Sequence, residues 1–144
     1  MNALYVDTSA LVKLYLDEAG SERMTDKVRA ADLVMVSVLA WPETLATLAR
    51  SHRDSRISAA AYDAVHARFV ADWTQLSAVD LDGRVLEIVD RLVDAHPLRG
   101  AHAAHLASAL ALREAGLDVE FACSDRMLLS AARAERLTAF DPAA

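Results

Sequence analysis

Three acidic residues, Asp7, Glu43 and Asp125, occupy comparable places in the sequence, each just after a short apolar run. The runs that precede them are residues 3–6, 33–39 and 119–123. Carboxylates that converge on one cleft raise one another's pKa unless a cation lies between them. Oxygen ligands of this kind suit Mg²⁺ or Mn²⁺, which can activate water and stabilise the charge on a phosphodiester during in-line displacement. The pattern predicts a divalent-metal site with nuclease chemistry.

Each of these carboxylates also has a simpler explanation. Asp7 and Asp125 are of a type that caps a following helix, and Glu43 would be favoured by the helix dipole in a first turn. For each residue taken alone, such a structural role explains its position as well as a catalytic role does. The joint placement at strand ends favours a shared site. Hydroxyl residues next to the acids are expected to support that site: Thr8, Ser9 and Ser124.

A histidine-containing stretch, residues 98–110, is expected to form a fourth wall of the site. It reads Leu-Arg-Gly-Ala-His-Ala-Ala-His-Leu-Ala-Ser-Ala-Leu. An Ala-rich segment without internal charges follows the Arg-Gly pair, which predicts a helix that is buried on most sides. The first turn of this helix carries His102 and His105.

Short apolar runs alternate with helical periodicity along the whole chain. Strands are expected at 3–6, 33–39, 76–81, 119–123 and 137–140. Helices are expected from about 9 to 20, over 21–30, from 42 to about 50, along the stripe of Tyr62, Val65, Phe69 and Trp73, from about 85 to 96, over 100–116 and over 126–134. The alternation indicates a parallel sheet covered on both faces, a three-layer α/β/α fold. Ligands of such folds bind beyond the carboxyl ends of the strands, where the three acids fall.

The bulk properties are those of a single domain over residues 1–144. Of its residues 54% are hydrophobic and 25% charged, and a net charge of −6 argues against a large basic nucleic-acid surface, although local patches can override it. The lone Cys123 cannot form an internal disulfide and is expected to be a small buried hydrophobe. No signal peptide and no apolar run of the roughly 20 residues that a membrane span needs is visible, so we expect a cytoplasmic protein.

Four segments together resemble PIN domains, specifically the VapC-type toxins of bacterial toxin–antitoxin pairs. They are Tyr-Val-Asp-Thr-Ser-Ala-Leu-Val-Lys-Leu-Tyr at 5–15, Glu43 followed by Arg50, the stretch 98–110, and Ser-Asp-Arg-Met-Leu at 124–128. The resemblance runs from Ala3 to Pro142. It implies a PIN-like fold and a Mg²⁺- or Mn²⁺-dependent endoribonuclease that cuts cellular RNA, often transfer or ribosomal RNA. It also implies a VapB-type antitoxin that holds the toxin inactive.

The resemblance makes four positions the catalytic and metal-binding residues: Asp7, Glu43, His102 and Asp125. The three acids match the family's ligands directly, but His102 stands where such toxins usually carry aspartate, while His105 matches a common family residue. Imidazole binds Mn²⁺ or Zn²⁺ better than Mg²⁺, so one explanation is a changed metal preference. A second is a weakened PIN fold that binds antitoxin or RNA without cutting, and a third is a disabling substitution selected during cloning. A histidine that merely hydrogen-bonds a neighbouring carboxylate is compatible with all three.

The expected RNA contacts are Lys13, Arg50 and Arg126, because Lys and Arg are the main ligands of phosphates. Lys13 is expected to face solvent, and Arg50 to lie two helical turns beyond Glu43 on the same face. For Arg53 and Arg56, in a polar loop expected over 50–56, ordinary solvated charges are the better interpretation. Apolar surface left by the early helices would serve an antitoxin segment or a homodimer.

An alternative to the nuclease interpretation is a receiver-type phospho-acceptor domain, because such domains also have alternating strands and helices with acids at strand ends. Such a domain would need a paired acid after the first strand and a lysine after the last strand. The sequence Val6-Asp7-Thr8 offers a single acid, and no lysine follows Lys27. The nuclease interpretation therefore accounts for more of the sequence.

Overall fold

A five-stranded parallel sheet organises the computed structural model, which describes residues 2–144. The strands are β1 (Asn2–Val6), β2 (Leu33–Ser37), β3 (Ser77–Val79), β4 (Asp118–Ala122) and β5 (Thr138–Phe140). Their order in the sheet is β3-β2-β1-β4-β5, and every neighbouring pair is parallel. The buried central strand β1 thus lies between β2 and β4, and the carboxyl ends of all three meet at one edge.

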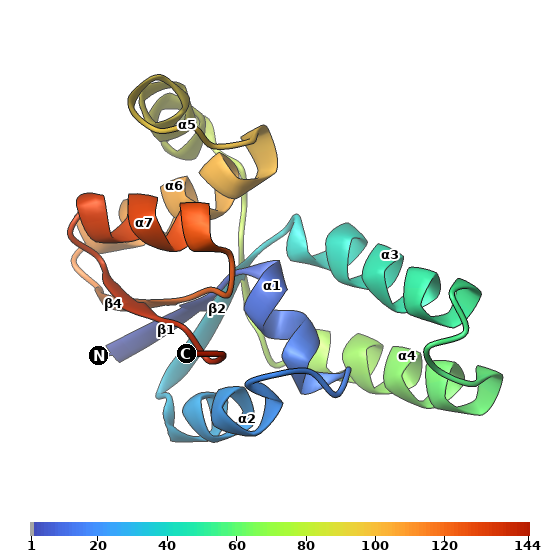
Figure 1. The fold of residues 1–144 in the computed structure, drawn as a ribbon. Helices are drawn as coiled ribbons and strands as arrows, with labels where there is room; N and C mark the ends of the chain where they lie inside the picture. Colours follow the sequence, from blue (N-terminus) through green and yellow to red (C-terminus); the bar gives the residue numbers. More distant parts are fainter. Residues whose placement is uncertain (1) are drawn as a thin grey trace.

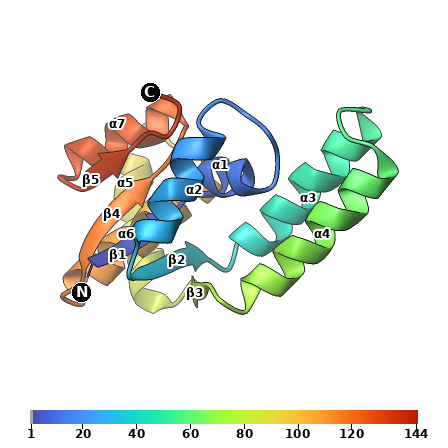
Figure 2. The ribbon, with the colours of Figure 1, turned by 90° about the horizontal axis from the view of Figure 1, so that it is seen from below.

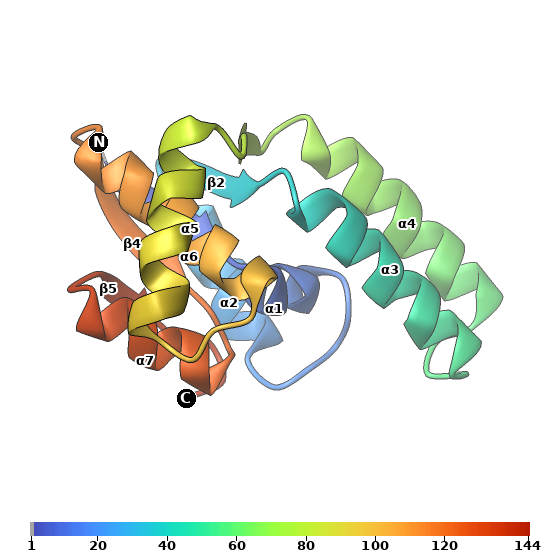
Figure 3. The same ribbon diagram turned by 90° about the horizontal axis from the view of Figure 1, so that it is seen from above.

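Helices cover both faces of this sheet, as expected for a three-layer α/β/α fold (Figure 1). They are α1 (Thr8–Leu11), the 3₁₀ helix η1 (Val12–Leu14), α2 (Ser21–Ala30), α3 (Ala40–Arg53), α4 (Ala59–Trp73), α5 (Gly83–Ala95), α6 (Gly100–Glu114) and α7 (Arg126–Ala134). Helices α5, α6 and α7 lie over one face, as Figure 3 shows, and their core residues pack with Tyr5 and Phe121. Helices α1 to α4 pack with Leu4 and Val6 on the other. Successive residues of β1 therefore serve opposite cores, as the period of a strand requires.

Helices α3 and α4 form an antiparallel arm that extends beyond the sheet (Figure 2). The predicted stripe on α4 packs inward, since Phe69 is fully buried and its ring lies 5.3 Å from that of Tyr15 and 5.5 Å from that of Trp41. Aromatic pairs in such contacts stabilise the fold by more than the burial of their apolar surface alone. The stripe is therefore a packing surface, as the sequence favoured, and not a cofactor site.

The first helical segment is shorter than predicted. It changes from α-helix to 3₁₀ helix at Val12, and the Tyr15 N–H closes the last turn on the Val12 carbonyl at 3.0 Å. Residues 15–20 form a loop, in which Gly20 has a φ of 90°. A Cβ on Gly20 would lie 2.5 Å from the Pro142 carbonyl oxygen. This glycine is thus required by the close approach of the C-terminal segment, as well as by its left-handed conformation.

The expectation that Lys13 faces solvent is wrong. Its side chain is 8% exposed, and its Nζ lies 3.3 Å from the Glu18 Oε1 atom. The change of helix type at Val12 alters which side chains share a face, so the α-helical spacing no longer predicts the orientation of Lys13. A buried, paired ammonium group is poorly placed to bind an RNA phosphate.

Helix α3 starts earlier and ends later than predicted. Strand β2 stops at Ser37, whose Oγ accepts the Leu39 N–H at 3.1 Å, and the helix begins at Ala40. Pro42 fits in the first turn because N–H groups there have no partner within the helix. Since the helix continues to Arg53, Arg50 lies in α3 and not in the predicted basic loop. Glu43 keeps its predicted position in the first turn.

None of the helices among residues 2–144 is both long enough and apolar enough to cross a membrane. Cys123 is fully buried, as expected of a small hydrophobe, and it is a free thiol. Its burial, together with the charges of Asp7 and Asp125 nearby, raises the pKa of the thiol well above its ordinary range. Cys123 is therefore a packing residue beneath the strand ends that carry the two acids.

Candidate active site

The ends of β1 and β4 bring Asp7 and Asp125 to one edge of the sheet. Val6 pairs with Ala122, and the Asp7 N–H donates to the Ala122 carbonyl at 3.0 Å. The Ser9 hydroxyl donates to Asp7 Oδ2 at 2.5 Å and accepts the Ser124 N–H at 3.0 Å. Ser9 thus ties Asp7 to the segment that carries Asp125, and both aspartates cap the helices that follow them, α1 and α7.

Glu43 approaches the same edge from the first turn of α3, which follows β2. Its Oε1 accepts the Thr8 hydroxyl at 2.8 Å and lies 2.6 Å from Nε2 of His105. That nitrogen is also 3.7 Å from Asp7 Oδ1. Thr8 and His105 therefore connect Glu43 to the end of β1.

His105 is the buried centre of this arrangement, with only 1% of its surface exposed. A carboxylate only accepts hydrogen bonds, so Nε2 is assigned as the donor to Glu43. The other ring nitrogen, Nδ1, lies 3.1 Å from the Tyr5 hydroxyl. Burial, with the nearby charge of Asp7, raises the pKa of Tyr5 far above its usual range, so the phenol stays neutral. Tyr5, His105 and Glu43 thus form one hydrogen-bonded chain from the core to the site.

The local charges favour an ionised Glu43. Burial alone would raise the pKa of Glu43, but the hydrogen bond and charge of His105, the hydrogen bond from Thr8 and the charge of His102 lower it. For His105, burial acts to lower the pKa, and the hydrogen bond that Nε2 donates to Glu43, with the charges of Asp7 and Glu43, raises it. The carboxylate and the imidazole therefore stabilise each other's charged forms.

Each of the three acids uses one carboxylate oxygen for protein donors and keeps the other. Asp7 Oδ2 accepts from the Ser9 N–H and hydroxyl, Glu43 Oε1 from Thr8 and His105, and Asp125 Oδ1 from the Leu128 N–H at 2.9 Å. The second oxygens make no hydrogen bond within residues 2–144: Asp7 Oδ1, Glu43 Oε2 and Asp125 Oδ2. Asp7 Oδ1 lies 3.7 Å from Nε2 of His105, which is within ion-pair distance but too far for a hydrogen bond. The Ser124 hydroxyl beside them is buried without a partner there. These oxygens fit the hard-ligand preference of a divalent cation.

The side chains do not form a closed metal cage as they stand. Within the described part of the chain, no three His, Cys, Asp or Glu residues are placed so that they could hold an ion together. Mg²⁺ usually keeps several waters and takes only one or two carboxylates from a protein, so a preformed cage is not required. The ligand roles therefore stay predictions that rest on the unengaged oxygens.

The two histidines of α6 have different surroundings. His102 is half-buried, one helical turn before His105, and its charge lowers the pKa of Glu43, so it lies near that carboxylate. His105, not His102, makes the direct contacts with Glu43 and Asp7. Sequence reasoning missed this role. The available signal was Tyr5, a hydroxyl-bearing residue in an aliphatic strand, because a buried tyrosine hydroxyl usually has a partner.

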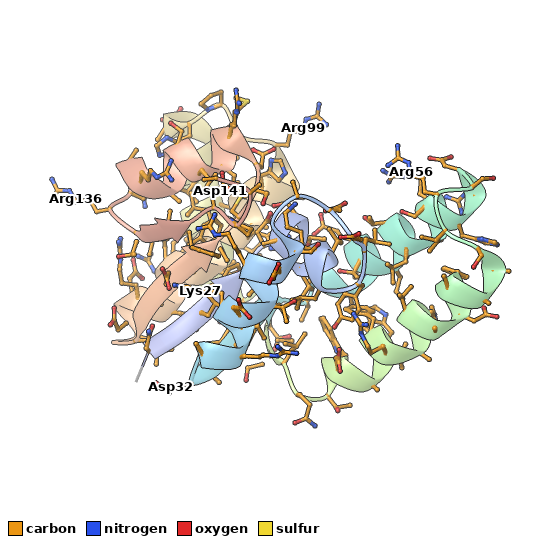
Figure 4. All side chains as sticks on the ribbon, turned by 60° about the horizontal axis from the view of Figure 1, so that its bottom comes forward. Lys27, Asp32, Arg56, Arg99, Arg136 and Asp141 are labelled. Carbon is orange, nitrogen blue, oxygen red and sulfur yellow. The ribbon has the colours of Figure 1, made fainter. Side chains whose placement is uncertain are left out.

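The predicted RNA-binding arginines are exposed. Arg50 lies in the last part of α3, and Arg126 opens α7 directly after Asp125. Arg99 at the start of α6 and Arg56 at the tip of the arm project from the same side of the molecule, as Figure 4 shows. The protein therefore carries exposed arginines despite its negative net charge, whereas Lys13 is buried.

The chain belongs to the PIN domain family, whose sequence model matches residues 4–140. Among characterised relatives, "Ribonuclease VapC45" of Mycobacterium tuberculosis is 37% identical over 134 residues, which cover 93% of this chain and 92% of the relative. The chain is thus similar to VapC ribonucleases over nearly its whole length, which confirms the family predicted from its motifs.

Solved structures share the fold at lower sequence identity. M. tuberculosis VapC20, described as a sarcin-ricin loop cleaving toxin, has a TM-score of 0.64 and 20% identity, with 89% of this chain and 94% of that chain covered. A toxin–antitoxin complex from Klebsiella pneumoniae has a TM-score of 0.60 and 17% identity, with 85% and 86% covered. These similarities confirm the three-layer α/β/α fold.

Proposed function

We propose that this chain is a metal-dependent endoribonuclease toxin of a VapBC-type toxin–antitoxin pair. The observation that carries the proposal is the set of three carboxylates that follow β1, β2 and β4, with Glu43 in the first turn of α3. Each of them keeps one oxygen that makes no hydrogen bond within residues 2–144, although Asp7 Oδ1 lies 3.7 Å from Nε2 of His105. The 37% identity to a protein named as a VapC ribonuclease supports RNA as the substrate.

The proposed metal-binding residues are Asp7, Glu43 and Asp125, with His102 as a fourth. A bound Mg²⁺ or Mn²⁺ would supply an activated water and neutralise charge on the scissile phosphate. The chain's own residues prepare this site. Ser9 occupies Asp7 Oδ2, and Thr8 and His105 occupy Glu43 Oε1, so that one oxygen of each acid remains for the ion. Ser124 contributes its backbone N–H to the same network.

The proposed RNA contacts are Arg126 and Arg50. Arg126 adjoins Asp125 and is suited to bind a phosphate next to the scissile one, since guanidinium groups match phosphate geometry. Arg50 lies two turns of α3 beyond Glu43, where it can bind a phosphate further along the strand. These cations give local attraction for RNA in a chain whose net charge is −6.

The proposed partner is a VapB-type antitoxin, and the proposed compartment is the cytoplasm, where cellular RNA is available. The solved toxin–antitoxin complex with the same fold supports such a partner. Half-buried apolar residues of the early segments leave a surface for it: Leu14, Leu16 and Val28. We also propose a homodimer, for which the mass in solution is the test.

RNA cleavage with controlled metal content tests the function. We expect the purified chain, stripped with a chelator, to leave RNA intact and to cut it when Mn²⁺ or Mg²⁺ is restored, because the carboxylates alone activate no water. Fragment analysis on a gel measures this. A protein that binds RNA but never cuts it with either ion would instead be the weakened PIN-fold binding module. His102 favours that alternative, because it lacks the negative charge of the aspartate that such toxins usually carry there.

A further inference from the structure

We propose that Tyr5, acting through His105, is a positioning residue that sets how Glu43 is presented to the metal ion. This inference rests on the proposed function, because it assumes that Glu43 binds the ion. Within residues 2–144, the Tyr5 hydroxyl makes its side-chain hydrogen bond to His105 and none to a carboxylate oxygen of the site. Its effect would therefore reach the ion only through the imidazole.

Tyr5 provides a rigid base for this chain of contacts. It lies in the central strand β1, is fully buried, and stacks on Phe121 with ring centroids 5.5 Å apart and an interplanar angle of 11°. This stacking fixes the plane of the phenol. The hydroxyl is consequently held at one point, 3.1 Å from Nδ1 of His105.

His105 links the Tyr5 hydroxyl to Glu43. Both ring nitrogens are engaged, Nδ1 with Tyr5 and Nε2 with Glu43 Oε1 at 2.6 Å. The imidazole cannot turn about its Cβ–Cγ bond without losing both contacts. Because α6 is buried from Ala103 to Leu110, packing restrains a compensating shift of its backbone. The ring orientation is therefore determined from the core side, by the Tyr5 hydroxyl.

The fixed imidazole selects which oxygen of Glu43 remains for the ion. Nε2 and the Thr8 hydroxyl both contact Oε1, and neither contacts Oε2. If the ring were free to rotate, Glu43 would lose one of two donors on Oε1, and its carboxylate could turn away from Asp7. Groups that orient metal ligands in this way commonly change metal affinity 10–100-fold when they are removed.

Tyr5→Phe is the direct test, because it removes the hydroxyl and keeps the ring that stacks on Phe121. We expect the Kd for Mn²⁺, measured by calorimetry, to rise roughly tenfold or more. Tyr15→Phe is the matched control, since Tyr15 is also a buried residue and its hydroxyl donates to an acid, Asp72, at 2.8 Å, outside the site. It should leave the Kd unchanged.

Two variants of His105 test whether Tyr5 acts through the imidazole. His105→Gln keeps a side-chain N–H that can reach Glu43, so it should retain part of the Mn²⁺ affinity, whereas His105→Leu should lose more. In the His105→Leu background, Tyr5→Phe should cause no further loss of Mn²⁺ affinity, because the imidazole that links Tyr5 to Glu43 is already absent. If the losses of Mn²⁺ affinity caused by Tyr5→Phe and His105→Leu were fully additive in the double variant, the proposal would be overturned.

A metal-free readout separates this inference from the proposed function. In NMR spectra, the Nε2–H proton of His105 should be downfield and protected from exchange in the unchanged chain and in Tyr15→Phe. It should broaden or vanish in Tyr5→Phe. A protected signal in Tyr5→Phe, or an unchanged Kd for Mn²⁺, would overturn the positioning role alone. A chain that shows this NMR pattern but neither binds Mn²⁺ nor cuts RNA would overturn the proposed function and, with it, the role of Tyr5 toward the ion.

Discussion

Asp7→Asn should reduce metal-dependent RNA cleavage by on the order of a thousandfold, because several kcal/mol of metal-derived stabilisation are at stake and each 1.36 kcal/mol is about tenfold in rate. The substitution preserves shape and can keep the acceptor for the Ser9 N–H. It replaces the unengaged Oδ1 by an amide group that cannot bind a cation. Gel-based cleavage rates measure the loss, and the melting temperature should change little.

Asp118→Asn is the matched control for Asp7→Asn. Asp118 is an exposed acid at the start of β4, at the opposite end of the strand from Asp125. It carries the same charge change without touching the proposed site, so cleavage should persist. Equal cleavage by Asp7→Asn and the unchanged chain would mean that another site or a contaminating nuclease cuts the RNA.

His102→Asp should lower the Kd for Mg²⁺ by roughly tenfold, or about 1.4 kcal/mol, and lower the Kd for Mn²⁺ less. The change adds a negative charge and a hard oxygen near Glu43, and Mg²⁺ depends on such donors more than Mn²⁺ does. Calorimetric titration of both ions measures the difference. Expression without antitoxin should also arrest growth more strongly for this variant than for the chain as given.

His66→Asp provides the charge-matched control for position 102. His66 is exposed on α4, so the substitution changes the net charge equally, without a new ligand near Glu43. Its Mg²⁺ affinity should equal that of the unchanged chain. Unchanged Mg²⁺ affinity in His102→Asp would show that position 102 is not a ligand position, and equal growth arrest would show that His102 is already competent.

The strands, and the position of Asp7 and Asp125 just after two of them, were predictable because they depend on local signals. Short apolar runs followed by capping residues such as Asp7 and Asp125 identify buried strands, and parallel pairing then brings their carboxyl ends together. Helix α7 was predicted over the bounds that the structure shows. The bounds of these strands and of α7 can be predicted without knowing which strands pair.

The errors came from contacts between distant segments. The orientation of Lys13 depends on the 3₁₀ turn and on the loop that follows, where Gly20 lies against Pro142 from the far end of the chain. A helical spacing rule has no access to that contact. The predicted helix to Gly20 was wrong for the same reason.

The sequence also could not show which of the two histidines, His102 or His105, contacts the carboxylates of the site. Helix α6 is apolar around most of its circumference, so its composition does not indicate which side faces the sheet. The structure turns His105 toward Tyr5 and Glu43 and leaves His102 half-buried nearby. The resemblance to VapC toxins directed the sequence interpretation to position 102, and the supporting role of His105 became visible only with the fold.

The central claim is that the unengaged oxygens of Asp7, Glu43 and Asp125 bind a divalent ion at the carboxyl edge of the sheet. Anomalous diffraction at the manganese edge, from crystals grown with Mn²⁺, tests it most directly. We predict an anomalous peak within roughly 2.0–2.4 Å of Asp7 Oδ1 and of an oxygen of Asp125 or Glu43. The same peak should be absent from crystals of Asp7→Asn. No peak at this edge at saturating Mn²⁺, or one bound only elsewhere on the protein, would contradict the account.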